Sequence, residues 1–242
     1  MVELSSTQKK VLDIFNNDGV KRAWNYWKLM GNTYGIFLGE VPSNEFIDGG
    51  TLANHIGLTE GVLCNADTPW LKFLLDERII YVPMKPLIHT ITWDTINESG
   101  AVFENEGVRI NIGGKNYDVT LLRGANVNSV DTVTDDTGFD LSFTHNSEWN
   151  RLMYPIHSGI HTNTSNPSYP SIPYAQWATY SDEDLLIEHG GGVASVSWTQ
   201  ETPNNSVLER LVRGGFGVAG VGSSPNTYTN SSIGWRPTLR LI

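Results

Sequence analysis

Apolar residues near the start of the chain repeat at helical spacing. One apolar stripe runs through residues 4–15, with serines available in front of it as an N-cap, and the polar run 16–19 ends it. Trp24 and Trp27 belong to a second stripe that ends at Gly31. Helices this short cannot bury their own faces. We expect them to pack on the rest of the chain or on a partner, and their N-terminal position favours the partner.

Alternation of apolar and polar residues predicts two antiparallel hairpins farther along the chain. Residues 70–75 and 79–82 are rich in strand-forming residues and are joined by a polar turn. Residues 108–112 and 117–121 alternate around a Gly-Gly pair, which supplies the positive φ angles of a tight turn.

The remaining patterns are shorter. They predict a strand and a short helix near residues 52–56, a capped helix at 92–97, a helix that Ser147 caps and Pro155 ends, and strands at 193–199, 208–212 and 235–242. The chain holds 24 Gly and 11 Pro, which indicates many turns and few long helices. The pattern as a whole predicts an α+β fold that is mostly antiparallel β.

The charge balance limits the classes of partner. The formal net charge is −10, whereas nucleic acids and anionic membranes attract cationic proteins. No apolar run approaches the ~20 residues that a membrane span needs, and the first 30 residues lack a signal-peptide pattern. We therefore expect no nucleic-acid partner and no membrane insertion.

Few residues carry a catalytic or metal-binding pattern. Cys64 is the single cysteine, so neither an internal disulfide nor an all-cysteine zinc site is expected, and a small buried residue is the preferred interpretation. His157 and His161 have a metal-ligand spacing, but the nearby Pro155 and Gly159 argue against a helix there. Together with His189, they are interpreted as loop histidines.

An acidic stretch at residues 131–140 leaves two interpretations open. Its carboxylates are Asp131, Asp135, Asp136 and Asp140. Oxygen-rich loops bind calcium, but the spacing does not follow that of an EF-hand loop. A solvated acidic loop is preferred and calcium is the alternative, so no metal and no cofactor are expected.

Four segments of the second half resemble, in order, the formylglycine-generating, sulfatase-modifying family. They are Ser-Glu-Trp-Asn-Arg-Leu at 147–152, Ser-Trp-Thr-Gln-Glu at 197–201, Leu-Val-Arg-Gly-Gly-Phe at 211–216 and Ile-Gly-Trp-Arg-Pro-Thr-Leu at 233–239. The resemblance implies a variant of the C-type-lectin-like fold. Activity in that family depends on redox cysteines late in the domain, and Cys64 lies far upstream, so we expect no enzymatic activity.

Further segments resemble tailed-phage virion proteins. They lie at residues 37–42, 52–59, 69–73 and 85–87, and such proteins also finish with Gly-Trp-Arg-Pro, as at 234–237. The resemblance implies a virion protein made in the host bacterial cytoplasm. It implies other virion proteins as partners and, because fibres and decorations are usually symmetric, a homo-oligomer. A trimer is the favoured state.

These observations lead to a two-part organisation and a leading function. Residues 1–66 are expected to form a small helical and β attachment or oligomerisation region, and residues 67–242 a C-type-lectin-like domain. The leading interpretation is a non-enzymatic structural protein of the phage particle, in a fibre, in a tail or on the capsid as a decoration.

The alternative interpretation is a host-receptor adhesin that binds carbohydrate through residues 223–232. This segment precedes the final strand, a position on the ligand-facing loops of lectin-like folds. Its mixture of Tyr with Asn, Ser and Thr is typical of binding loops. The candidate ligand-binding residues are Asn226, Tyr228, Thr229 and Asn230, and a host cell-surface glycan is the candidate ligand.

Overall fold

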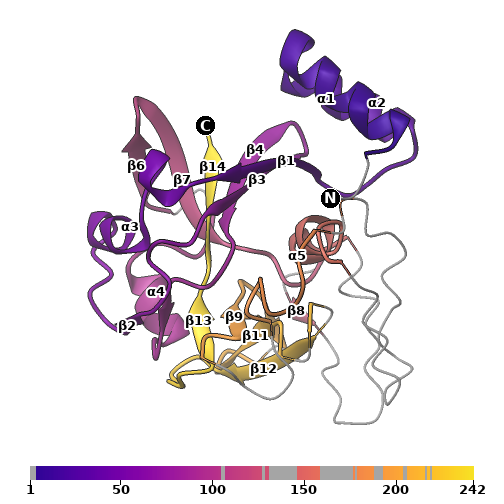
Figure 1. Ribbon diagram of the computed structural model, residues 1–242. Helices are drawn as coiled ribbons and strands as arrows, with labels where there is room; N and C mark the ends of the chain where they lie inside the picture. Colours follow the sequence, from indigo (N-terminus) through magenta and orange to yellow (C-terminus); the bar gives the residue numbers. More distant parts are fainter. Residues whose placement is uncertain are drawn as a thin grey trace.

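Two six-stranded sheets form the framework of the described chain (Figure 1). The computed structural model describes residues 4–104, 107–126, 129–130, 146–158, 177, 179–187, 193–203, 206–215, 217–218 and 220–242. The helices are α1 (Ser6–Asp18), α2 (Val20–Leu29), α3 (Gly49–His55), α4 (Trp93–Glu98) and α5 (Glu148–Met153), with a 3-10 helix η1 (Ser43–Glu45). The strands are β1 (Ile36–Val41), β2 (Val62–Leu63), β3 (Trp70–Leu75), β4 (Arg78–Pro83), β5 (Ile88–His89), β6 (Arg109–Ile112), β7 (Lys115–Leu121), β8 (Ser129–Val130), β9 (Val196–Trp198), β10 (Thr202–Pro203), β11 (Glu209–Arg213), β12 (Val221–Pro225), β13 (Ile233–Trp235) and β14 (Pro237–Leu241).

The first sheet is antiparallel throughout, with strand order β1-β3-β4-β14-β7-β6. It contains both predicted hairpins. Asp76 and Glu77 join β3 to β4 with φ angles of 48° and 65°, and Gly113 and Gly114 join β6 to β7 with φ angles of 56° and 81°. Positive φ at both turn residues gives the connection a twist that matches the flanking strands.

The second sheet has the order β12-β11-β9-β13-β5-β2 and is antiparallel except where β13 runs parallel to β9. A short parallel pair, β8 with β10, lies outside both sheets. The α+β, mostly antiparallel class expected from the sequence is therefore confirmed. Residues before 67 supply strands to both sheets, because β1 belongs to the first and β2 to the second.

The chain passes from one sheet to the other at Arg236. The sequence predicts one strand at 235–242, but the structure divides this region into β13 and β14, which lie in different sheets (Figure 1). The Arg236 side chain is buried and donates hydrogen bonds to the carbonyl oxygens of Met84, at 2.9 Å, and Leu185. These distant partners fix the crossing point, and local alternation along the chain does not reveal them.

Side-chain N-caps begin several helices at the predicted residues. Ser5, Thr92 and Ser147 each accept a hydrogen bond from the backbone N–H three residues later, with N···O distances of 3.2, 2.9 and 3.2 Å. Each cap satisfies one of the N–H groups that a helix start leaves without a partner.

Helices α1 and α2 pack side by side beyond β1, and residues 4–32 are called the helical lobe below (Figure 1). Trp24 and Trp27 on α2 are both 2% exposed. The Trp27 indole donates to the carbonyl oxygen of Tyr34 at 2.8 Å, and its ring centroid lies 5.5 Å from that of Trp177. The structure therefore buries these rings within the chain itself, the alternative that the sequence analysis favoured less.

Candidate functional site

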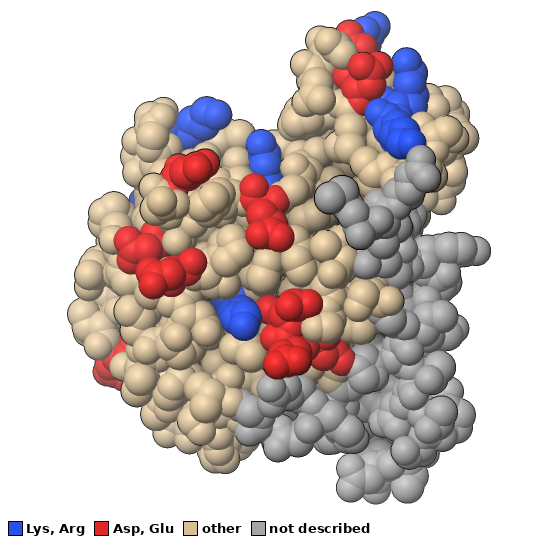
Figure 2. Space-filling model, viewed as in Figure 1, with Lys and Arg blue, Asp and Glu red and all other residues tan. Residues whose placement is uncertain are grey.

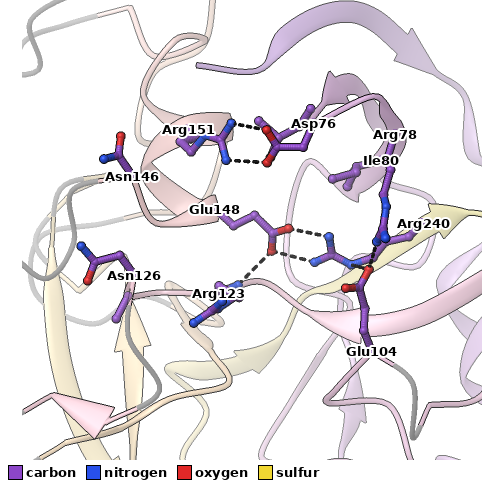
Figure 3. A pocket seen from close by; sticks show the side chains of 12 residues that line it. Asp76, Arg78, Ile80, Glu104, Arg123, Asn126, Asn146, Glu148, Arg151 and Arg240 are labelled. Carbon is purple, nitrogen blue, oxygen red and sulfur yellow. Dashed lines mark hydrogen bonds and ion pairs between the residues drawn. The ribbon is translucent and has the colours of Figure 1, made fainter. Parts of the chain in front are cut away.

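A cavity of about 560 Å³ opens where α5, the β3–β4 turn and β14 meet (Figure 3). Charged side chains dominate its lining: Arg78, Arg123, Arg151 and Arg240 with Asp76, Glu104 and Glu148. Leu75, Ile80, Ala125, Asn126 and Asn146 complete it. The chemistry of the cavity therefore depends on how its arginines and carboxylates are paired.

A bidentate ion pair between Glu148 and Arg240 forms the inner wall. The two guanidinium NH groups donate to the two carboxylate oxygens at 2.5 and 2.6 Å, and the backbone N–H of Arg123 donates to Glu148 Oε2 at 3.0 Å. Burial alone would raise the pKa of Glu148, but the charge and hydrogen bonds of Arg240 outweigh it and lower that pKa. Glu148 is therefore ionised, and α5 is tied to the central strand of the first sheet.

Arg240 is held on its other side as well. Its Nε donates to Thr120 Oγ1 at 2.9 Å and lies 3.6 Å from Glu104 Oε1. At the rim of the cavity, Glu104 also forms a close ion pair with Arg78. The guanidinium group of Arg240 is thus fixed by groups from three separate segments.

Arg151 on α5 joins three parts of the chain. It donates to both carboxylate oxygens of Asp76 in the β3–β4 turn at 2.6 and 2.8 Å, and its Nε donates to the carbonyl oxygen of Thr33 at 2.8 Å. Its guanidinium also lies 5.9 Å from the ring centroid of Trp24. One side chain therefore connects the helical lobe, the first sheet and α5.

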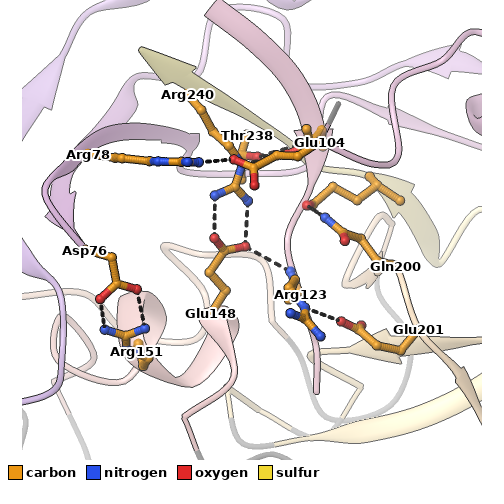
Figure 4. A network of polar contacts seen from close by, with 12 residues as sticks. Asp76, Arg78, Glu104, Arg123, Glu148, Arg151, Gln200, Glu201, Thr238 and Arg240 are labelled. Atoms are coloured by element: carbon orange, nitrogen blue, oxygen red, sulfur yellow. Dashed lines mark hydrogen bonds and ion pairs between the residues drawn. The ribbon is translucent and has the colours of Figure 1, made fainter. Parts of the chain in front are cut away.

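A second carboxylate, Glu201, is buried behind Arg123 (Figure 4). Arg123 Nε donates to Glu201 Oε1 at 3.2 Å, and the Gly124 N–H donates to Oε2 at 2.8 Å. Burial raises the pKa of Glu201 to about 7, because these two donors offset only part of the cost of desolvating its charge. Its side chain is 1% exposed, so the carboxylate holds neighbouring segments together instead of facing a ligand.

The charged groups of this cavity are directed at one another. Each of its three carboxylates contacts an arginine, and a guanidinium does not lose its proton in proteins. A reaction by nucleophilic catalysis needs a nucleophile beside a base. The described lining holds no such pair, but it offers rigid donors and acceptors to the hydroxyl, amide or anionic groups of a ligand.

The predicted ligand loop is partly strand. Residues 223–225 belong to β12 and pair with β11. Asn226 directs its amide inward, where Nδ2 donates to the two carboxylate oxygens of Asp94 at 2.8 and 3.0 Å. Its backbone N–H also donates to the carbonyl oxygen of Leu208 at 2.9 Å. Asn226 therefore anchors the loop to α4 and to the start of β11.

The outer part of the loop presents Tyr228 and Thr229, which are both exposed, Tyr228 by 43%. Asn230 Nδ2 donates to Tyr228 Oη at 3.0 Å, while Asn230 Oδ1 accepts from the backbone N–H of Ser232 at 2.8 Å. These bonds connect two of the four candidate residues, Tyr228 and Asn230, with Ser232 in one small cluster. No residue of this loop lines the cavity at α5.

Other candidate groups have structural partners or lie outside the described residues. His157 is buried, and its Nε2 lies 2.9 Å from Asp182 Oδ1. Burial raises the pKa of the half-buried Cys64 thiol, which keeps it protonated. His161, His189 and the acidic stretch 131–140 are outside the described residues. Within the described ranges, no three His, Cys, Asp or Glu side chains are grouped to hold a metal ion.

Sequence reasoning did not identify the charged cavity. Arg123, Glu148, Arg151 and Arg240 all fall inside or beside segments that the sequence analysis used as markers of fold. A signal was present, because Arg240 stands between Leu239 and Leu241 in an apolar strand and so indicates a buried guanidinium in need of a partner.

The chain was compared with known proteins at the level of family, sequence and structure. Neither the protein-family models, nor the curated proteins, nor the solved structures gave a match to the chain. Among its described helices, none combines the length and apolar character needed to span a bilayer.

Proposed function

We propose that the chain is a non-enzymatic structural protein of a tailed-phage particle, a fibre, decoration or tail component that displays a lectin-like domain. It is made in the host bacterial cytoplasm, contacts other virion proteins and assembles with copies of itself, with a trimer favoured. The proposal starts from the resemblance of its segments to phage virion proteins.

The observation that carries the proposal is the use of charge in the cavity at α5. Arg240, Glu148 and Arg151 connect α5 to the first sheet through ion pairs, and Arg151 also donates to the carbonyl oxygen of Thr33, the residue that follows the helical lobe. Side chains committed in this way favour a rigid support over a reaction centre, since catalytic acids and bases must exchange protons with substrate.

Electron microscopy of phage particles with gold-labelled antibodies against the purified chain tests the proposal. We expect label at a defined position on the particle, at a fibre end, on the tail or across the capsid. Particles from a mutant phage that lacks the coding sequence provide the control and should carry no label. Intact particles without label, from cells in which the chain is abundant, would contradict the proposal.

Glycan binding by the 223–232 loop is the second candidate. It is favoured by the exposed ring of Tyr228, whose hydroxyl is fixed by Asn230. An immobilised aromatic face beside amide and hydroxyl groups suits a sugar ring. The tyrosine side chain is already held in place, so it loses little conformational entropy on binding.

A glycan array probed with the wild type and two variants tests this candidate. Tyr228→Ala should lower binding at least about tenfold, which corresponds to about 1.4 kcal/mol. Tyr228→Phe retains the stacking face and should keep most of the binding. Equal binding by Tyr228→Ala and the wild type would remove the loop as the glycan site.

A further inference from the structure

The helical lobe and the rest of the chain carry opposite charge. Residues 4–32 contain five Lys or Arg and two Asp, whereas residues 33–242 contain 11 basic and 23 acidic residues. In Figure 2 the lobe shows Lys and Arg beside a smaller number of Asp, and most of the visible Asp and Glu lie on the body below it, among a few Lys and Arg. Here the body means residues 33–242.

The exposed surface of the body is more acidic than the overall composition of residues 33–242, because several of its arginines are buried or paired. Arg213, Arg236 and Arg240 are buried, and Arg78 and Arg109 are engaged by Glu104 and Asp118. Among the described residues of the body, Lys115 is the one cation of the exposed class that makes no ion pair, and Lys72 and Lys85 are partly buried. Exposed carboxylates such as Glu45, Asp67 and Glu183 have no ion-pair partner in the described chain.

One face of α2 is exposed along the length of the helix. Lys21, Asn25, Lys28 and Leu29 lie at i, i+4, i+7 and i+8, so they form a single stripe, called here the outer face of α2. All four are exposed, and Leu29 is 82% exposed. The opposite side of the helix holds the buried tryptophans, so this stripe points away from the body.

A groove lined mostly by polar residues lies near the end of this face. A hollow of about 320 Å³ lies between the two helices, lined by Ser5, Thr7, Gln8, Trp27, Met30 and Asn32. Met30, at the end of α2, is 51% exposed and follows Leu29 directly. Exposed apolar residues flanked by charge are typical of protein interaction surfaces.

We propose that the outer face of α2 docks on the acidic body of a second copy of this chain. Lys21 and Lys28 make no ion pair among the described residues, so they are available for carboxylates of the neighbouring copy. Leu29 and Met30 then lose contact with water. Because lobe and body are different surfaces, the contact is head-to-tail and closes into a ring when the rotation between copies allows it.

Light scattering at 50 and 500 mM NaCl tests the salt dependence of the contact. We expect self-association at low salt that weakens about tenfold or more at high salt, because screening acts on exposed charges. Lys21→Glu with Lys28→Glu should weaken it to a similar extent, and Leu29→Ser with Met30→Ser should also weaken it. Lys115→Glu is the matched control, since it reverses an exposed, unpaired lysine on the body and should leave association unchanged.

Cross-linking identifies the partner surface. An equal mixture of nitrogen-14 and nitrogen-15 chains is treated with a carbodiimide, which joins an amine directly to a carboxylate. We expect mixed-isotope peptides that link Lys21 or Lys28 to carboxylates of the body. Cross-links confined to single copies, a monomer at both salt concentrations, or equal association of the Lys21→Glu/Lys28→Glu and Lys115→Glu variants would overturn the inference.

This inference rests on the proposed role as an assembled particle component, but the two can fail separately. A chain that labels phage particles and stays monomeric keeps the proposed function and loses the head-to-tail contact. A chain that assembles through α2 and is absent from particles loses the proposed function.

Discussion

Two buried carboxylates lie on opposite sides of the same short stretch of backbone. The N–H of Arg123 donates to Glu148, and the N–H of Gly124 donates to Glu201. Glu148 also receives the two-pronged guanidinium of the buried Arg240, whereas Glu201 receives a single bond from Arg123, whose side chain is 40% exposed. The pKa of Glu148 is lowered and that of Glu201 is raised to about 7.

The difference shows that burial alone does not decide the charge of a carboxylate. Burial disfavours the charged form of both carboxylates, because it removes water from them. At Glu148, a parallel pair of N–H donors from a buried arginine outweighs this desolvation cost. One bond from a half-exposed arginine does not outweigh it at Glu201. This stretch of backbone therefore lies between one ionised carboxylate, Glu148, and one carboxylate, Glu201, whose pKa is close to neutral pH.

The largest expected effect comes from removing the charge of Glu148. Glu148→Gln leaves Arg240 buried without its main counter-charge, and breaking a buried ion pair in this way costs about 3 to 5 kcal/mol. Urea unfolding at pH 6 measures the free energy of unfolding. Glu201→Gln is the matched control, and its loss should be below about 1 kcal/mol at this pH. Equal losses for the two variants would contradict the comparison.

The pH dependence of stability should differ at the two sites. Glu201 holds its proton more tightly in the folded chain, so the free energy of unfolding falls as pH rises from about 4.5 towards and through 7, by about 3 kcal/mol. For Glu148 the sign is opposite, and its contribution is lost as pH falls below the ordinary glutamate range.

Thermal unfolding followed by circular dichroism between pH 4.5 and 8 measures the contribution of Glu201. In the Glu201→Gln variant, the decline in stability from pH 5 to 8 should largely disappear. A decline of the same size in that variant and the wild type would assign the pH dependence to other groups.

A smaller effect is expected where the same ion-pair geometry is open to water. Arg151 binds Asp76 through two bonds, as Arg240 binds Glu148, but the Asp76 side chain is 57% exposed. Asp76→Asn should therefore cost only about 0.5 to 1 kcal/mol in the free energy of unfolding, measured in urea. A loss as large as that of Glu148→Gln would mean that geometry, and not burial, sets the strength of these pairs.

Local features of the fold could be predicted from the sequence because short-range rules determine them. The Gly113–Gly114 turn and the caps at Ser5, Thr92 and Ser147 each depend on residues within a few positions of one another. The division of the last strand at Arg236 could not be predicted, because the partners that fix it lie near residues 84 and 185.

The charged cavity is harder to predict for the same reason. Glu148 and Arg240 are separated by 92 positions, and Arg123 and Glu201 by 78. An arginine between leucines indicates that a partner must exist, but nothing in the pattern tells which of the chain's 26 acidic residues it is. The candidate loop was located by composition, and its inward-facing Asn226 could not be distinguished from the exposed Tyr228 without the strand pairing.

The position of β14 has a consequence for the order of events during synthesis. This strand fills the middle of the first sheet, between β4 and β7, yet the ribosome makes it more than a hundred residues after β7. At ordinary translation rates that interval is on the order of ten seconds, during which β4 and β7 expose unpaired backbone edges. A chain stopped before residue 237 lacks both the central strand and Arg240, so the first sheet closes only in copies translated beyond this point. A truncated product therefore keeps unpaired strand edges exposed, and these remain recognisable to chaperones and proteases.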